Sequence, residues 1–204
     1  MTQYLFSRRS LSLSAALAVV LAGLAVTPAL ADTTSTDTSA CVAPQTSQPW
    51  LSAGDSNWYT LVPGETPGNL NGTGWTLSGG AQIITTQLPD GQTGSVLNLP
   101  SGSKAVSPTV CVNSNDPTAR TMVRNVVGGE GVQFYVGYAG TATWTNPRNT
   151  GQVHGQQNSW TVSDPINVQP DNLSGWQLVR FTFVPGGQRS DFQLYDFYVD
   201  PRMH

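Results

Sequence analysis

Few side chains in this 204-residue sequence have the types and spacing that catalysis requires. Hydrolysis by paired carboxylates needs an acid and a base at a defined separation, and Glu65 and Glu130 are the only glutamates. Both stand in glycine-rich turns, where we expect solvated side chains. Ser101 begins a Ser-x-x-Lys spacing, but Pro100 and Gly102 predict a turn instead of the helix that this motif needs. We therefore predict no catalytic residues and a protein that is not an enzyme.

Saccharide binding is the chemistry that the aromatic residues favour, because sugar C–H groups stack on exposed ring faces beside amides. Tyr135 shares the polar face of an alternating strand with Gln133, and Trp144 stands in an irregular segment. Tyr135, Trp144 and Gln133 are thus the candidate ligand-binding residues. Trp58 and Trp160 stand at strand starts and are expected in the core. Exposed aromatic rings also mark protein-contact surfaces, so that alternative stays open.

The elements that must position these residues are short β-strands. Apolar and polar residues alternate in segments such as Ser95–Leu99 and Gly131–Tyr138, and Gly/Pro turns separate them. This pattern is typical of an all-β sandwich. The mature chain has no uninterrupted helical period, so we predict a single jelly-roll β-sandwich over residues 41–204 with little or no helix. Ala139–Asn158 is the least regular segment, and irregular segments of that length are often functional or mobile.

The closing stretch predicts a β-hairpin. Val179, Phe181 and Phe183 alternate with polar residues, and the glycines after Pro185 predict a turn. The alternation then changes phase inside the last strand, which indicates a β-bulge near Tyr195–Asp196. Asp196 on that bulge is a candidate calcium ligand, because calcium prefers oxygen ligands in flexible geometry. A hydrogen-bonded structural role for Asp196 is the alternative.

The N-terminus carries the features of a secretory signal peptide over residues 1–31. Arg8-Arg9 precede an apolar run that ends in Ala29-Leu30-Ala31, a small-x-small cleavage signature. Residues 7–11 also resemble a twin-arginine motif, so both export routes stay open. A polar tail over residues 32–40 is predicted to be disordered. In an exported chain the default for Cys41 and Cys111 is a disulfide bond.

The motifs Gly74-Trp75-Thr76-Leu77, Ser101-Gly102-Ser103 and Leu194–Pro201 resemble galactose-binding-like jelly rolls. Many members of that group are carbohydrate-binding modules of secreted bacterial enzymes, and the mature chain is similar to small secreted bacterial proteins of this shape. The resemblance implies a structural calcium at Asp196. Tyr195 replaces a second acidic residue that the family often carries there. The family's Phe-Glu turn is absent from residues 68–72.

Three functions remain, in order of preference. The first is a non-catalytic secreted module that binds carbohydrate or another cell-surface component. The second is a structural or protein-interaction domain of the envelope, and the third is a glycan-directed hydrolase. The chain has 9 Lys and Arg against 12 Asp and Glu, and such an acidic, charge-poor composition argues against nucleic-acid partners. After signal cleavage no integral membrane segment is expected.

Overall fold

The computed structural model describes residues 36–114, 116–168 and 175–200. These residues all fall within one compact unit. The predicted signal peptide lies outside them, so it stays a prediction. Of the predicted tail, Ser39 and Ala40 lie in a turn, and the Ser39 N–H donates to Asp37 Oδ1 over 2.9 Å. The predicted disorder of the tail stays a prediction. No helix in the described part has the length and apolar character needed to cross a bilayer.

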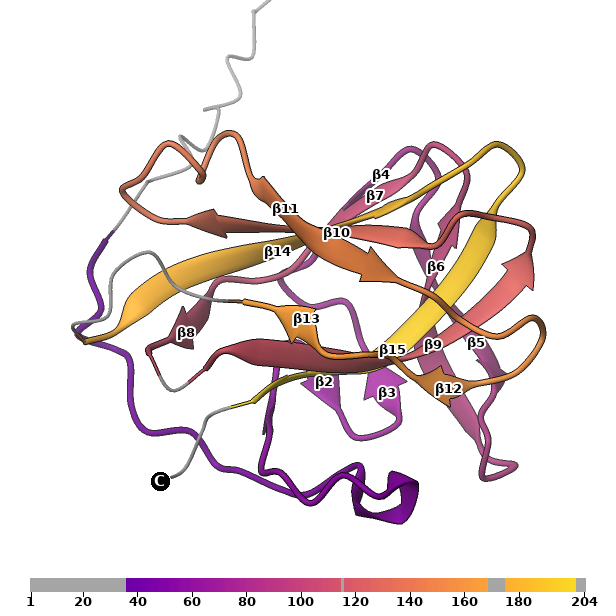
Figure 1. Cartoon of the computed structure of the whole chain (residues 1–204), viewed down its shortest axis with the longest axis horizontal. Coiled ribbons are helices and arrows are strands. Elements are labelled where there is room, and N and C mark those ends of the chain that lie inside the picture. The colour runs from indigo at the N-terminus through magenta and orange to yellow at the C-terminus, as the bar shows by residue number, and fades with distance from the viewer. Residues whose placement is uncertain (1–35, 115, 169–174, 201–204) are drawn as a thin grey trace, which may run out of the picture. The chain divides into compact units, whose positions relative to one another are not determined.

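Two antiparallel sheets make up most of the structure (Figure 1). The first has the strand order β12-β9-β15-β6-β5, with β1 beside β15 and β13 beside β9. Its strands are β1 (Thr60–Leu61), β5 (Gln82–Gln87), β6 (Thr93–Pro100), β9 (Thr118–Val127), β12 (Thr161–Val162), β13 (Ile166–Asn167) and β15 (Asp191–Asp200). We call it the terminal sheet, because it contains the last strand of the chain.

The second sheet has the order β11-β10-β14-β7-β4, with β8 beside β14. Its strands are β4 (Thr76–Ser78), β7 (Lys104–Val106), β8 (Val110–Val112), β10 (Val132–Tyr138), β11 (Arg148–Val153) and β14 (Gln177–Pro185). We call it the opposite sheet. A two-stranded ladder of β2 (Glu65–Thr66) and β3 (Asn69–Leu70) stands apart, and η1 (Leu51–Ala53) is the helical element of the described residues.

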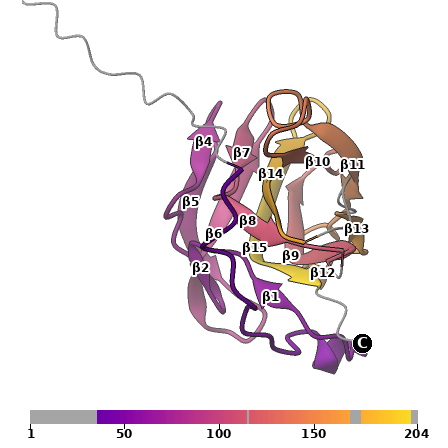
Figure 2. The ribbon, with the colours of Figure 1, turned by 90° about the vertical axis from the view of Figure 1, so that its left-hand side faces the viewer.

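The inner faces of the two sheets bury a shared aromatic core. Phe134, Phe181 and Phe183 come from the opposite sheet, and Phe197 reaches them from the terminal sheet with ring centroids 5.0–5.8 Å away. All four are almost fully buried. Alternation along each strand therefore places one face in the core and the other outside. Figure 2 shows β10, β11 and β14 in one layer and β9, β12 and β15 in the other. This confirms the predicted jelly-roll β-sandwich.

The predicted closing hairpin is wrong, although both of its strands exist. β14 pairs with β10, β7 and β8, whereas β15 pairs with β1, β6 and β9. The chain therefore crosses from one sheet to the other after Pro185. Both strands alternate because each buries one face against the opposing layer, and alternation does not identify the strand alongside. The bulge is confirmed: the register shifts between Tyr195 and Tyr198, and Asp196 has φ +53°.

Ala139–Asn158 is more regular than predicted. It contains β11, which pairs with β10 from Val132–Val153 to Val136–Arg148. The loop before it is held by threonines: Thr143 Oγ1 accepts the Tyr138 N–H over 3.0 Å, and Thr141 Oγ1 donates to the Tyr138 carbonyl over 2.8 Å. β11 lies at the edge of its sheet and consists mostly of polar residues, so its sequence lacks the apolar alternation that would predict a strand.

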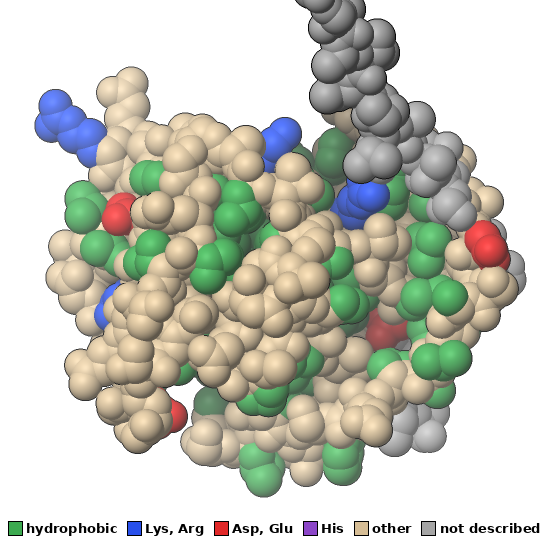
Figure 3. All heavy atoms as spheres, turned by 180° about the vertical axis from the view of Figure 1, so that it is seen from behind, with side chains coloured by type: hydrophobic (Ala, Val, Ile, Leu, Met, Phe, Trp, Pro, Cys, Tyr) green, Lys and Arg blue, Asp and Glu red, His purple; other side chains and the backbone are tan. Residues whose placement is uncertain are grey.

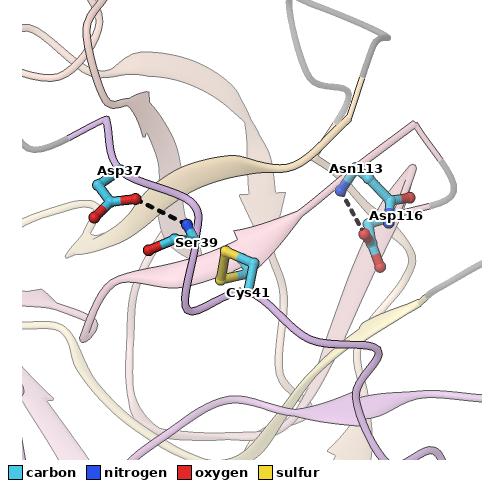
Figure 4. Close-up of a disulfide and its surroundings, with 6 residues drawn as sticks. Asp37, Ser39, Cys41, Asn113 and Asp116 are labelled. Atoms are coloured by element: carbon cyan, nitrogen blue, oxygen red, sulfur yellow. Dashed lines mark hydrogen bonds between the residues drawn. A yellow bond between two sulfur atoms is a disulfide. The ribbon is translucent and has the colours of Figure 1, made fainter.

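The predicted disulfide is confirmed. Cys41 and Cys111 are bonded, with their Cα atoms 5.8 Å apart (Figure 4). Cys111 lies in β8, so the bond ties the N-terminal segment to the opposite sheet. Because 70 positions separate the two cysteines, the bond closes a long loop and restricts the unfolded chain more than a short one would.

Candidate functional site

Tyr135 and Gln133 lie on the outer face of the opposite sheet. They alternate along β10 with the buried Val132, Phe134 and Val136. Tyr135 stands directly opposite Asn149 in β11 and Thr182 in β14. Directly opposed residues share a face of the sheet, so the half-buried tyrosine ring has polar neighbours on both sides.

An amide pair stands next to the tyrosine. Asn149 Nδ2 donates to Gln133 Oε1 over 2.6 Å, and the Gly151 N–H donates to Asn149 Oδ1 over 3.0 Å. These bonds fix both amide groups in position. The Nε2 group of Gln133 is a further hydrogen-bond donor. Side-chain amides can both donate hydrogen bonds to hydroxyl groups and accept them. The surface is therefore polar and rigid beside one aromatic ring.

Trp144 joins the same face from the loop between β10 and β11. Its Cα would lie 3.4 Å from a Cβ placed on Gly137, two residues along β10 from Tyr135. The Arg180 guanidinium, opposite Gly137 in β14, lies 4.3 Å from the centre of the indole ring. One face of Trp144 is thus covered by a cation. Its buried Nε1 has no hydrogen-bond partner. The structure brings all three predicted residues to one face of the opposite sheet.

Glu65 and Asp196 form a pair of carboxyl groups that the sequence analysis missed. The Phe197 N–H donates to Glu65 Oε2 over 3.1 Å, and the Gly68 N–H donates to Asp196 Oδ1 over 2.7 Å. The expectation of a solvated Glu65 is therefore wrong, because the β2–β3 ladder folds onto the bulge of β15.

Burial decides the protonation of this pair. It raises the pKa of Glu65 well above its usual value; the Phe197 N–H opposes this rise and the Asp196 carboxylate adds to it. Burial also raises the pKa of Asp196 to about 6, against the Gly68 N–H. The Asp196 carboxylate raises the pKa of Glu65 because two negative charges lie close together, and a bound cation would offset that repulsion.

The pair fits part of a calcium site. Glu65 Oε1 is buried without a hydrogen-bond partner, and hard carboxylate oxygens are the ligands that calcium prefers. In the described part of the chain, however, His, Cys, Asp and Glu nowhere gather in threes. Main-chain carbonyls and water would have to complete the shell. Asp55 is engaged elsewhere, because it accepts the Tyr59 hydroxyl over 2.6 Å and pairs with Arg120 at 3.3 Å.

A cleft of about 870 Å³ opens on the outer face of the terminal sheet. Its floor includes Met122 of β9 and Tyr195 of β15, and Trp160 forms one wall. The turns after β2 and β5 and the segment around η1 complete it. Asp90 and Asp196 both line this cleft, together with Arg120. The sequence analysis named Asp196 as a candidate calcium ligand but did not predict a cleft here.

Trp160 and Trp58 depart from the predicted core positions. Trp160 lies on the outer side of the terminal sheet, where its ring meets Tyr195 edge-on at 4.8 Å and its Nε1 donates to the Gln87 carbonyl over 3.2 Å. Trp58 is 44% exposed. A tryptophan at the start of a strand can cover either face of the sheet. The expectation that Trp58 and Trp160 lie in the core was therefore wrong.

Charge is sparse on the surface. The face shown in Figure 3 consists mostly of uncharged polar side chains and backbone, with hydrophobic side chains between them and few charged groups. Such a surface does not favour a strongly charged partner through long-range attraction. Hydrogen bonding and contact with apolar groups remain as the means of recognition on this face.

Comparison with known proteins finds solved structures that match at low identity. No protein-family model matches the sequence. No curated protein matches it. The C-terminal family 22 carbohydrate-binding module of Clostridium thermocellum Xyn10B is 11% identical over 63% of this chain and 86% of that chain, with a TM-score of 0.41. The CBM22-1 xylan-binding domain of Paenibacillus barcinonensis Xyn10C is 14% identical over 64% and 88%, with a TM-score of 0.40.

A third solved structure, CsCBM6-3 from Clostridium stercorarium in complex with cellobiose, is 15% identical over 63% of this chain and 87% of that chain, with a TM-score of 0.39. At these identities and TM-scores the likeness carries no conclusion about function. The fold described above rests on this chain's own strand order and register.

Proposed function

We propose that this chain is a non-catalytic, exported module that binds saccharides on the outer face of its opposite sheet. The observation that carries the proposal is the gathering of Tyr135, Gln133 and Trp144, three residues from separate positions in the sequence, on one rigid polar face. A sugar ring stacks its C–H surface on Tyr135, while its hydroxyl groups bond to the neighbouring amides.

Pre-organisation supports this function. The Gln133–Asn149 bond and the cation over Trp144 hold the side chains before any ligand arrives. Binding therefore loses little side-chain entropy. Export is proposed from the predicted signal peptide, and the Cys41–Cys111 bond suits an oxidising compartment outside the cytoplasm.

Titration calorimetry with xylohexaose, cellobiose and β-1,4-galactotriose tests the proposal; these are saccharides bound by solved structures of similar strand arrangement. We expect Tyr135→Ala to weaken binding about tenfold, which corresponds to a loss of about 1.4 kcal/mol. Trp58→Ala is the matched control, because this exposed ring lies in the N-terminal segment. If Tyr135→Ala and Trp144→Ala both leave binding intact, the proposed face is wrong.

A second candidate is a glycan-directed hydrolase, because Asp90 and Asp196 line the same cleft. It ranks lower, since each acid already has a structural role: Asp90 Oδ1 accepts the Gln92 N–H and Asp196 Oδ1 accepts the Gly68 N–H. Release of reducing ends from xylan would support it, provided that Asp90→Asn abolishes the release. An envelope interaction domain is the remaining alternative, and it predicts no saccharide binding at all.

A structural calcium at Glu65 and Asp196 is proposed alongside the binding function. Calcium there would neutralise the two carboxylates and hold the β2–β3 ladder against the bulge of β15. A free calcium concentration of 100 times the dissociation constant stabilises the folded protein by about 2.7 kcal/mol. This raises the melting midpoint of a domain this size by several degrees. We expect that rise on adding calcium to chelator-treated protein. Glu65→Gln should abolish it, and the exposed Asp164→Asn should not. An unchanged wild-type midpoint contradicts the proposal.

A further inference from the structure

The bulge of β15 directs two consecutive side chains to the same cleft. In a regular strand, neighbouring residues point to opposite faces of the sheet. Tyr195 and Asp196 nevertheless both line the cleft on the outer face of the terminal sheet, and the next residue, Phe197, returns to the core. The bulge achieves this with Asp196 at φ +53°.

A positive φ at a residue other than glycine is uncommon, and such backbone strain concentrates at functional sites. Asp196 is not needed in this conformation to fill the core, because Leu194 and Phe197 do so on either side. The strained position is instead the one that brings a carboxylate to the cleft beside an aromatic ring. The bulge is therefore the backbone feature that brings the Asp196 carboxylate into the cleft.

The aromatic wall of the cleft is fixed in advance. Trp160 is held by the edge-on contact with Tyr195, by its bond to the Gln87 carbonyl and by the Arg124 guanidinium 4.7 Å from its ring centre. Apolar side chains, among them Leu88 and Met122, continue this wall. A ligand with an apolar surface can thus be accommodated without reordering the side chains.

The charged groups of the cleft select the class of ligand. Asp90 and Asp196 provide carboxylate acceptors, and Arg120, paired with Asp55, provides donors. An anionic ligand meets two carboxylates, and a cationic ligand meets a guanidinium. Hydroxyl groups both donate and accept, so a neutral polyhydroxy ligand satisfies both kinds of group. The volume of about 870 Å³ lies in the range of about 300–1,000 Å³ found for small-molecule sites.

We propose that this cleft is a second saccharide site, separate from the Tyr135 face and on the other side of the sandwich. It binds a neutral sugar unit, with C–H groups against Trp160 and hydroxyl groups on Asp90, Asp196 and Arg120. The choice of a saccharide as ligand rests on the proposed function. The location of the second site rests on the cleft and the bulge. Two sites on opposite faces would let one module bridge two saccharide chains.

Titration calorimetry of the full mature chain with xylohexaose, cellobiose and β-1,4-galactotriose tests this. We expect at least one of these probes to bind with two sites per wild-type chain, and we expect Tyr135→Ala to weaken one of them about tenfold and leave the other unchanged. Asp90→Asn, an exposed position, should weaken the other site, the cleft, about tenfold, as expected when a hydrogen bond to a charged group is lost. Trp160→Ala should abolish it, with a melting curve to show that the variant is folded.

The possible outcomes distinguish the cleft from the Tyr135 face. A single site that Tyr135→Ala weakens about tenfold and Asp90→Asn leaves unchanged overturns the cleft and keeps the proposed function. A single site that responds to Asp90→Asn and Trp160→Ala but not to Tyr135→Ala supports the cleft and overturns the Tyr135 face. No binding of any of the three probes by the wild type overturns both.

Discussion

Asp116→Asn should make the protein more stable at neutral and alkaline pH. Asp116 precedes β9 and is 4% exposed, and its Oδ2 accepts the Asn113 N–H over 2.6 Å. Burial raises the pKa of its carboxyl group to about 6; the Asn113 N–H opposes the rise and the Asp200 carboxylate adds to it. The charged form is therefore disfavoured in the folded protein.

The magnitude follows from the change in pKa. The usual value is 3.8, and one pKa unit corresponds to about 1.4 kcal/mol, so the ionised Asp116 reduces stability by about 3 kcal/mol. Because folding raises this pKa, the folded state binds the proton more tightly than the unfolded chain does. The contribution of the protonated Asp116 to the free energy of unfolding is thus fully present below pH 3.8 and is lost as the pH rises through 6. Asparagine keeps an acceptor for the Asn113 N–H and carries no charge, so the variant avoids this loss.

Urea unfolding followed by tryptophan fluorescence measures the effect at pH 4, 6 and 8 with the disulfide intact. We expect Asp116→Asn to exceed the wild type by about 3 kcal/mol at pH 8 and to match it near pH 4. Asp164→Asn is the control, since surface substitutions usually stay within about 0.5 kcal/mol. A variant less stable than the wild type at pH 8, or a difference independent of pH, would refute the reasoning.

Three further perturbations have expected outcomes. Replacing both Cys41 and Cys111 by serine should lower stability by about 4 kcal/mol in the chain-entropy model, measured by urea unfolding; an unchanged midpoint contradicts this. Gly137→Ala would place a Cβ 2.7 Å from the Thr143 carbonyl oxygen and displace the Trp144 segment, so calorimetry should show weaker saccharide binding; wild-type affinity would exclude a role for that segment. Phe134→Ala removes a fully buried ring that contacts three phenylalanines, and its loss of about 3–5 kcal/mol should appear as a lower midpoint in thermal melts.

The proposed saccharide-binding face was accessible to sequence reasoning because alternation is regular in β10. Gln133 and Tyr135 stand out as polar or amphipathic residues between buried Val132, Phe134 and Val136. Trp144 could be named as a candidate from its irregular surroundings, but not placed. Its position depends on the threonine bonds of the loop and on the space above Gly137, which only the folded loop defines.

The carboxyl pair shows where such reasoning ends. Glu65 and Phe197, joined by a hydrogen bond, are separated by 132 positions, and neither carries a local signal of the other. A glutamate in a glycine-rich turn is usually solvated, and here the turn itself is folded onto a bulge. The cleft beside it has the same origin, because its walls come from segments around η1, β2, β5, β9, β12 and β15.

By itself, the sequence determined the alternating strands but not the polar edge strand β11, together with the bulge at Tyr195–Asp196 and the pair of cysteines available for bonding. These are consequences of side-chain type and of the two-residue period of a pleated strand, which are local properties. Only the tertiary structure decided that β14 and β15 lie in different sheets, that Glu65 meets Asp196, and that the bulge opens into a cleft. The physical reason is that alternation records which face of a strand is buried, whereas the path of the chain decides what that face is buried against.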